Sequence, residues 1–186
     1  MPNPATNAPL LVHFEAGHQG AWATTQAMTH IGESLPSAPR LSIALAPGAG
    51  PAFWALRGVV SSLRYTTRAE AVDLLARSEG LGRPEASRAV LIPIRKSPAW
   101  WALAQDERRA IYEEQSRHTS IGMKYLPHIA RRLHHSRDLG EPFDFLTWFE
   151  FAPAHEAAFD ALLGELRASK EWTYVDREVE FRFDRT

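Results

Sequence analysis

Histidine and arginine are the side chains of this 186-residue chain best suited to chemistry, because it holds eight histidines and no cysteine. Without cysteine, the chain cannot form disulfides, zinc–thiolate sites or iron–sulfur clusters. The sequence also has no glycine-rich nucleotide motif, no HExxH zinc motif and no GxSxG nucleophile motif. Any redox or metal chemistry must therefore depend on histidine, carboxylate or tyrosine.

His118 is the most informative histidine, because it lies within the segment 106–126, which has the strongest helical pattern in the chain. This segment begins with acidic residues, contains no proline and stops at Pro127. At helical spacing, His118 shares a face with four apolar or small residues, namely Ile111, Ile121, Gly122 and Tyr125. We therefore expect the imidazole to face the interior.

An imidazole facing the interior is costly unless it has a partner, which leaves two interpretations of His118. It is either a core histidine bonded to a carbonyl group or an axial ligand of a metal or haem iron. In the second case, Gly122 would leave room for a flat ligand one turn away. Glu114, one turn earlier, or a carboxylate from elsewhere in the chain would hold the second ring nitrogen.

Two further pairs, Arg131–Arg132 and His134–His135, lie in a segment that reads as a strand. Neighbouring strand residues point to opposite faces, so the two histidines cannot bind one metal ion together. For the same reason one arginine must point inward, where it needs a carboxylate or another anion. On one continuous helix, His118 and Arg131 would lie about 20 Å apart, but Pro127 ends the helix and lets the chain turn back.

The elements that must position these residues indicate an α+β protein. We expect strands over 10–14, 41–45, 54–65, 89–94 and 174–183, a hairpin over 128–151, and helices over 21–31, 68–79, 106–126 and 154–168. This order resembles two ferredoxin-like modules, over residues 8–97 and 98–186, within one compact unit. Their antiparallel sheets would form an α+β barrel with the helices outside.

Composition and charge narrow the function further. The chain has 21 basic and 22 acidic residues, a net charge of −1, so we expect no nucleic-acid partner that depends on a global positive field. No apolar run approaches the length of a membrane span. The N-terminus lacks the pattern of a signal peptide, so residues 1–7 are expected to be a disordered tail and the protein to be cytoplasmic.

Four long blocks resemble the chlorite dismutase family of haem b proteins, in particular its short, dimeric branch. They are LIPIRKSPAWW (91–101), QDERRAIYEEQSRHT (105–119), KYLPHIARRLHHSRDLGEPFDFLTWFEF (124–151) and EWTYVDREVE (171–180). The resemblance implies a homodimer of α+β barrels with haem b in the C-terminal half. It implies that His118 is the proximal iron ligand, that Glu171 rather than Glu114 holds its second nitrogen, and that Arg131 is the distal catalytic residue.

The resemblance also implies roles at the edge of the haem. Lys96 and Trp101 would lie by the haem, with Lys96 near a propionate, and Arg64 and Tyr65 would reach the propionate edge. Ser78 stands where some short-branch relatives have a distal glutamine. Because serine cannot hold the distal arginine in the same way, we expect a freer guanidinium here.

The implied activity converts chlorite to chloride and dioxygen. Three alternatives remain: another haem activity on this fold, such as a coproheme decarboxylase or a peroxidase; a haem-binding or haem-transfer protein; and a haem-free interaction module. Decarboxylase relatives typically lack the distal arginine, so Arg131 argues against that activity. A Soret band would exclude the haem-free module, and oxygen release from chlorite would separate dismutation from the other haem functions.

Overall fold

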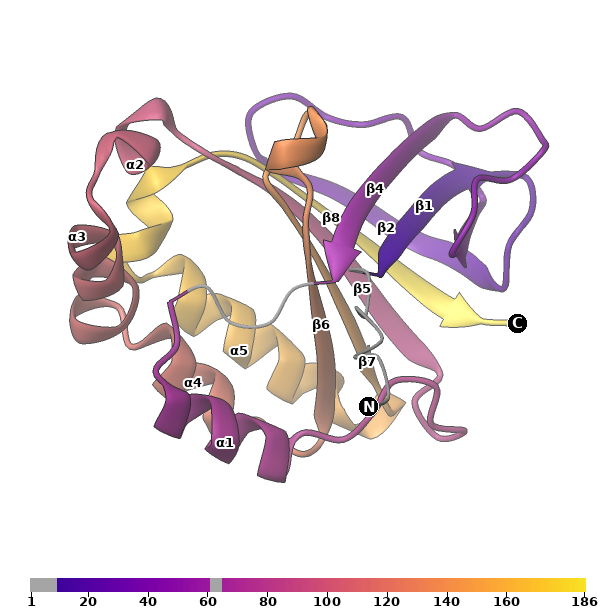
Figure 1. Ribbon diagram of the computed structural model, residues 1–186. Coiled ribbons are helices and arrows are strands. Elements are labelled where there is room, and N and C mark those ends of the chain that lie inside the picture. Colours follow the sequence, from indigo (N-terminus) through magenta and orange to yellow (C-terminus); the bar gives the residue numbers. More distant parts are fainter. Residues whose placement is uncertain (1–9, 61–64) are drawn as a thin grey trace, which may run out of the picture.

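Eight antiparallel strands close into a barrel in the computed structural model, which describes residues 10–60 and 65–186 (Figure 1). Around the barrel the strands follow the order β1-β3-β2-β8-β5-β7-β6-β4. Their bounds are β1 (Leu11–Gly17), β2 (Trp22–Ile31), β3 (Arg40–Ala44), β4 (Trp54–Val60), β5 (Arg88–Lys96), β6 (Ile129–His135), β7 (Phe145–Phe151) and β8 (Val175–Arg185). The predicted α+β class with an antiparallel barrel is confirmed.

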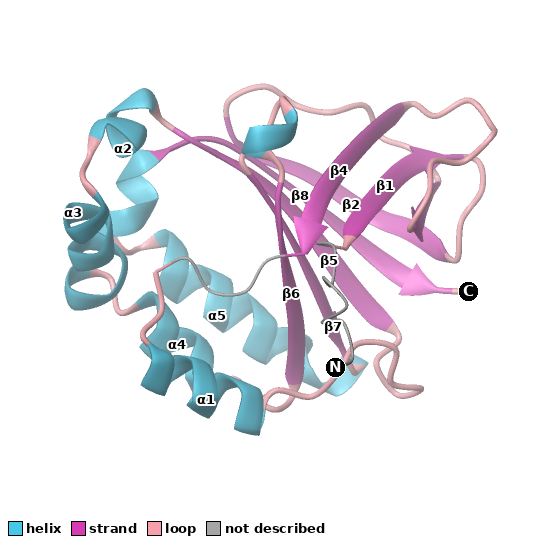
Figure 2. Cartoon of the chain, viewed as in Figure 1, coloured by secondary structure: helices cyan, strands magenta, loops and turns pink. Residues whose placement is uncertain are grey.

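The helices gather on one outer side of the barrel, next to β5, β6 and β7 (Figure 2). They are α1 (Arg68–Arg77), α2 (Pro98–Ala102), α3 (Gln105–Arg109), α4 (His118–Met123) and α5 (Glu156–Arg167). A π-helical turn, η1 (Ala110–Gln115), joins α3 to the segment before α4. Short 3-10 turns are η2 (Arg137–Leu139), η3 (Pro153–His155) and η4 (Lys170–Tyr174). In the described part of the chain, no helix is both long and apolar enough to cross a membrane.

The sheet has apolar residues on both faces because it separates two cores. On β7, Leu146 and Trp148 belong to the core inside the barrel, whereas Phe149 and Phe151 belong to the core under α5. Alternation along a strand sends successive side chains to opposite faces, so both faces of β7 must be apolar. This explains why the sequence of β7 reads as a nearly continuous apolar run.

Two predicted helices were wrong. Residues 21–31 form strand β2, whose backbone pairs with β8 along most of its length. The N-terminal half therefore has the order β1-β2-β3-β4-α1, without the helix that a ferredoxin-like module requires between its first strands. The predicted helix over 106–126 is broken into α3, η1 and α4, and Arg117 before α4 has a positive φ of 55°.

Most other predicted elements are present within a few residues of their expected ends, including the β6–β7 hairpin, α1 and α5. The expected tail over 1–7 and the end of the expected strand 54–65 lie outside the described residues. Strand β5 pairs with β7 on one side and with β8 on the other. The sequence-based division after residue 97 assigns β5 to the first module, and that division stays a prediction.

Candidate functional site

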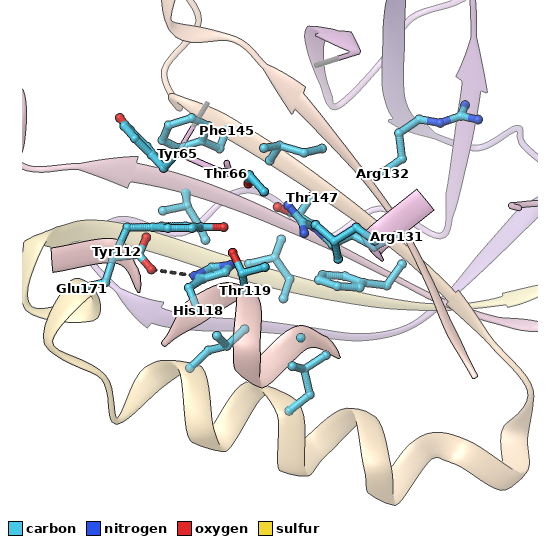
Figure 3. Close-up of a pocket in the computed structure, with 18 of the residues that line it drawn as sticks. Tyr65, Thr66, Tyr112, His118, Thr119, Arg131, Arg132, Phe145, Thr147 and Glu171 are labelled. Atoms are coloured by element: carbon cyan, nitrogen blue, oxygen red, sulfur yellow. Dashed lines mark hydrogen bonds and ion pairs between the residues drawn. The ribbon is translucent and has the colours of Figure 1, made fainter. Parts of the chain in front are cut away.

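A cavity of about 390 Å³ lies between the outer face of the sheet and the helices (Figure 3). Side chains from β5, β6 and β7 form one wall, and residues of α1, α4 and α5 form the others. The lining is mainly apolar, with a few polar groups that include His118, Arg131 and Glu171. This size and composition are typical of a site for a small molecule or cofactor.

His118 is the first residue of α4, and its imidazole forms a hydrogen bond with a buried carboxylate. Its Nδ1 lies 2.6 Å from Oε2 of Glu171, while Oε1 of Glu171 accepts a bond of 2.7 Å from Nζ of Lys96. The backbone N–H of Glu171 donates to Oγ of Ser116 at 2.7 Å. Glu171 is thus fixed at both its backbone and its side chain, and it joins segments far apart in sequence.

Electrostatics keep the Glu171 carboxylate ionised. Burial alone would raise its pKa, but the charges of His118 and Lys96, with their hydrogen bonds, lower the pKa to about 2. An ionised carboxylate accepts hydrogen bonds only, so the imidazole donates from Nδ1. When the imidazole is neutral, this bond leaves the lone pair of Nε2 available to a metal ion, the arrangement typical of histidine ligands. Glu114 is exposed, so it is not the carboxylate that holds His118.

The break before α4 is held by residues that the sequence did not reveal as functional. The Glu113 carboxylate accepts the backbone N–H of Thr119 at 2.6 Å, and it also accepts the backbone N–H and the hydroxyl of Ser120. The ring of Tyr112 stacks on the His118 imidazole. Burial raises the pKa of Tyr112 to about 12, despite the nearby positive charge of Arg131.

Arg131 lies on β6 with its side chain directed into the cavity, whereas Arg132 points away (Figure 3). Within residues 10–60 and 65–186, the Arg131 guanidinium makes no hydrogen bond or ion pair, so the expected carboxylate alternative finds no support there. His134 lies on the opposite face of β6, where its Nδ1–H donates to the carbonyl of Leu146 at 3.0 Å. Burial lowers the pKa of His134 to about 4, so this histidine is neutral.

The remaining predicted residues occupy mixed positions. Tyr65 and Ser78 line the cavity. Lys96 also lines the cavity, and its ammonium donates to the Glu171 carboxylate. The sequence analysis placed Lys96 near a haem propionate and did not anticipate this bond to Glu171. Trp100 lines the cavity, whereas Trp101 donates Nε1–H to Asp144 and is not among the lining residues, so its expected place by a haem stays a prediction. Arg64 lies outside the described residues.

Comparison with known proteins decides the family. The family model described as chlorite dismutase matches residues 52–185, which is well over half of the chain. The chain belongs to the chlorite dismutase family. A curated chlorite dismutase of Ideonella dechloratans is 32% identical over 100 residues, and the match covers 51% of this chain and 33% of that protein. This chain therefore spans about a third of the length of that curated relative.

Solved structures agree with this membership. A dimeric chlorite dismutase from Nitrobacter winogradskyi is 56% identical, with a TM-score of 0.88, over 94% of this chain and 99% of that chain. A chlorite dismutase from Candidatus Nitrospira defluvii in complex with imidazole is 28% identical, with a TM-score of 0.57. That match covers 77% of this chain and 56% of the other.

The chlorite dismutase family uses haem b, and the cavity has features that suit this group. Its apolar walls match a porphyrin, and a Cβ atom added at Gly122 would meet no atom within 4 Å apart from the backbone of its own helix. The hydroxyl of Tyr65 and Nε1 of Trp100 are buried in the described structure without hydrogen-bond partners. The two rings pack edge to face, 5.8 Å apart, so both polar groups lie at one end of the cavity. They are suitable donors for the carboxylates of a haem.

Proposed function

We propose that this chain is a haem b-dependent chlorite dismutase, which converts chlorite to chloride and dioxygen. The observation that carries the proposal is a single cavity containing a carboxylate-bonded histidine and an arginine that has no hydrogen-bond or ion-pair partner among the described residues. His118 and Arg131 come from different elements, α4 and β6, and both line this cavity. Membership of the chlorite dismutase family supports the same activity.

On the helix side of the cavity, His118 would hold the haem iron through Nε2, and Glu171 accepts its Nδ1–H. The hydrogen bond to an ionised carboxylate increases electron donation from the imidazole to a bound metal. Lys96 balances the buried charge of Glu171. Bound haem b would supply the iron redox chemistry, while these residues orient the ligand and set its basicity.

On the distal side, Arg131 is the catalytic residue. Its permanent positive charge attracts the chlorite anion into a mainly apolar cavity. The guanidinium would hold chlorite and any anionic species derived from it inside the cavity, so that one chlorite anion leaves as one chloride and one dioxygen. Fixed charges of this kind act strongly in a site with little water. With no partner among the described residues, the guanidinium is free to make these contacts.

The proposed assembly is a homodimer, following the similar Nitrobacter protein, which is described as dimeric. Light scattering on the purified protein would test this assembly. The cytoplasmic location stays a prediction.

One experiment tests the proposed activity. The purified protein is loaded with haem b, its absorbance spectrum is recorded, and oxygen release is followed after chlorite is added. A Soret band with stoichiometric oxygen release supports the proposal. A Soret band without oxygen release would indicate a different haem function, and no haem binding would contradict the proposal entirely.

A further inference from the structure

We infer that Tyr112 is a positioning residue that sets the plane of the His118 imidazole. The inference rests on the proposed function, because it assigns a role to a side chain beside the axial ligand. Its evidence is the local geometry of the chain between α3 and α4. None of the predicted site residues has this role.

The two rings lie face to face. Their centroids are 4.4 Å apart, and their planes differ by only 20°. The bond from Nδ1 to Glu171 fixes one point of the imidazole, but a ring held at one point can still tilt. A second ring stacked on its face removes that freedom, so the carboxylate and Tyr112 together define both position and plane.

An uninterrupted helix could not produce this contact. At 3.6 residues per turn, residues 112 and 118 would lie about 120° apart around the axis of an α-helix. The π-helical turn η1 and the left-handed backbone of Arg117 change this geometry and bring the two rings together. Single π-helical turns are uncommon and frequently occur at functional sites, which fits a specific role for this one.

Both partners of the stack are themselves held in place. The Glu113 carboxylate bonds to the backbone N–H groups of Thr119 and Ser120, which fixes the start of α4 and hence the backbone of His118. The ring of Tyr65 packs against the ring of Tyr112, and the two ring centroids are 5.4 Å apart. Neither ring of the stack can therefore move freely.

The stack is built into the protein itself, so it can be tested without haem. In the apoprotein, the ring current of Tyr112 should shift the Cε1–H resonance of His118, which is assigned by its loss in His118→Gln. Tyr112→Phe keeps a ring and should retain the shifted resonance. Tyr112→Leu and Tyr112→Met remove the ring, and the resonance should move toward that of an unstacked histidine. Two aliphatic variants keep the test valid if one of them does not fold.

The haem-loaded protein gives the second readout. The rhombic splitting of the ferric electron paramagnetic resonance signal depends on the orientation of the axial imidazole. We expect Tyr112→Phe to keep the wild-type splitting and the aliphatic variants to change it. Phe145→Leu is a matched control, because it also removes an aromatic ring from this cavity. The Phe145 ring packs on Trp101 and His135 and not on His118.

The outcomes separate this inference from the proposed function. Wild-type resonances and wild-type splitting in folded aliphatic variants would overturn the role of Tyr112. Haem binding and oxygen release by the wild-type protein would still support the proposed function. An equal change in Phe145→Leu would also overturn it, since the effect would then belong to the cavity as a whole. If the wild-type protein binds no haem, the proposed function fails. Independently, a His118 Cε1–H resonance that is not shifted in the wild-type apoprotein would exclude the stack.

Discussion

Replacing Glu171 with glutamine tests the buried triad of Lys96, Glu171 and His118 most directly. The side chains of Glu171 and Lys96 are only 6% and 4% exposed, and their charged atoms lie 2.7 Å apart. Glu171→Gln keeps the shape of the side chain but leaves a buried ammonium without its counter-charge. Removing one partner of such a pair typically costs about 3–5 kcal/mol. Because the amide oxygen can still accept one bond, we expect a loss of about 3 kcal/mol in the free energy of unfolding.

Urea denaturation of the apoprotein measures this loss without any contribution from haem. The double variant Lys96→Met with Glu171→Gln should recover much of the stability, because the unpaired charge is then absent. Glu165→Gln is the matched control, since Glu165 forms an ion pair with Lys124 at the surface. This variant should lose far less unfolding free energy than Glu171→Gln. Equal losses in Glu171→Gln and Glu165→Gln, or no recovery in the double variant, would refute the argument that the triad is a coupled buried unit.

The same substitution has a separate consequence in the haem-loaded protein. A neutral amide at position 171 reduces electron donation through the imidazole, so the ferric/ferrous reduction potential should rise. Spectroelectrochemical titration of wild type and Glu171→Gln measures the change. An unchanged potential would show that the carboxylate does not tune His118.

Three further predictions follow from individual side chains. His118→Ala should strongly reduce haem retention, measured as the Soret absorbance left after gel filtration; full retention would exclude it as the axial ligand. Arg131→Ala should keep the haem but lower oxygen release by about 10²–10³-fold and increase trapped hypochlorite, with only partial rescue by lysine; unchanged rates and leakage would exclude the distal role. His134 has a folded pKa of about 4 against an ordinary value of 6.5, so the unfolded chain binds more protons between these values. Neutral His134 therefore contributes up to about 3 kcal/mol to the free energy of unfolding. This contribution is complete above pH 6.5 and should be lost as the pH falls towards 4. Apoprotein unfolding free energies over this range, compared with His134→Leu, measure it; an equal slope in both would contradict the prediction.

Most of the fold could be predicted because its elements carry local signals. Strongly apolar strands such as β5 and β7, and the amphipathic helix α5, are visible in the sequence itself. Strand β2 was missed because most of its residues are partly or fully exposed, so it lacks a clear apolar alternation. Its conformation is set by pairing with β8, whose residues lie about 150 positions away.

The site shows the same division between local and distant causes. The face of the helix pattern pointed to His118, but only the family resemblance pointed to Glu171, which is 53 residues away. Glu113 was missed because an acidic residue in a helical pattern normally indicates a solvated surface. Tyr112 was missed because its contact with His118 depends on the break between α3 and α4, which the helical pattern did not reveal. The break at Arg117 has no glycine or proline to announce it, and it is held by contacts that form only when α4 is in place.

The barrel explains why folding and chemistry depend on the same strand. Side chains alternate along β6, so a shift of one residue would turn Arg131 into the barrel and Arg132 toward the helices. Two features oppose such a shift. All seven residues of β6 pair with β7, and its last two pair with β4 to close the barrel. Gly58 on β4 also lies so close to His134 that an added Cβ would come within 2.6 Å of the His134 Cβ. The packing that seats His134 inside the barrel is therefore the packing that keeps Arg131 directed into the cavity.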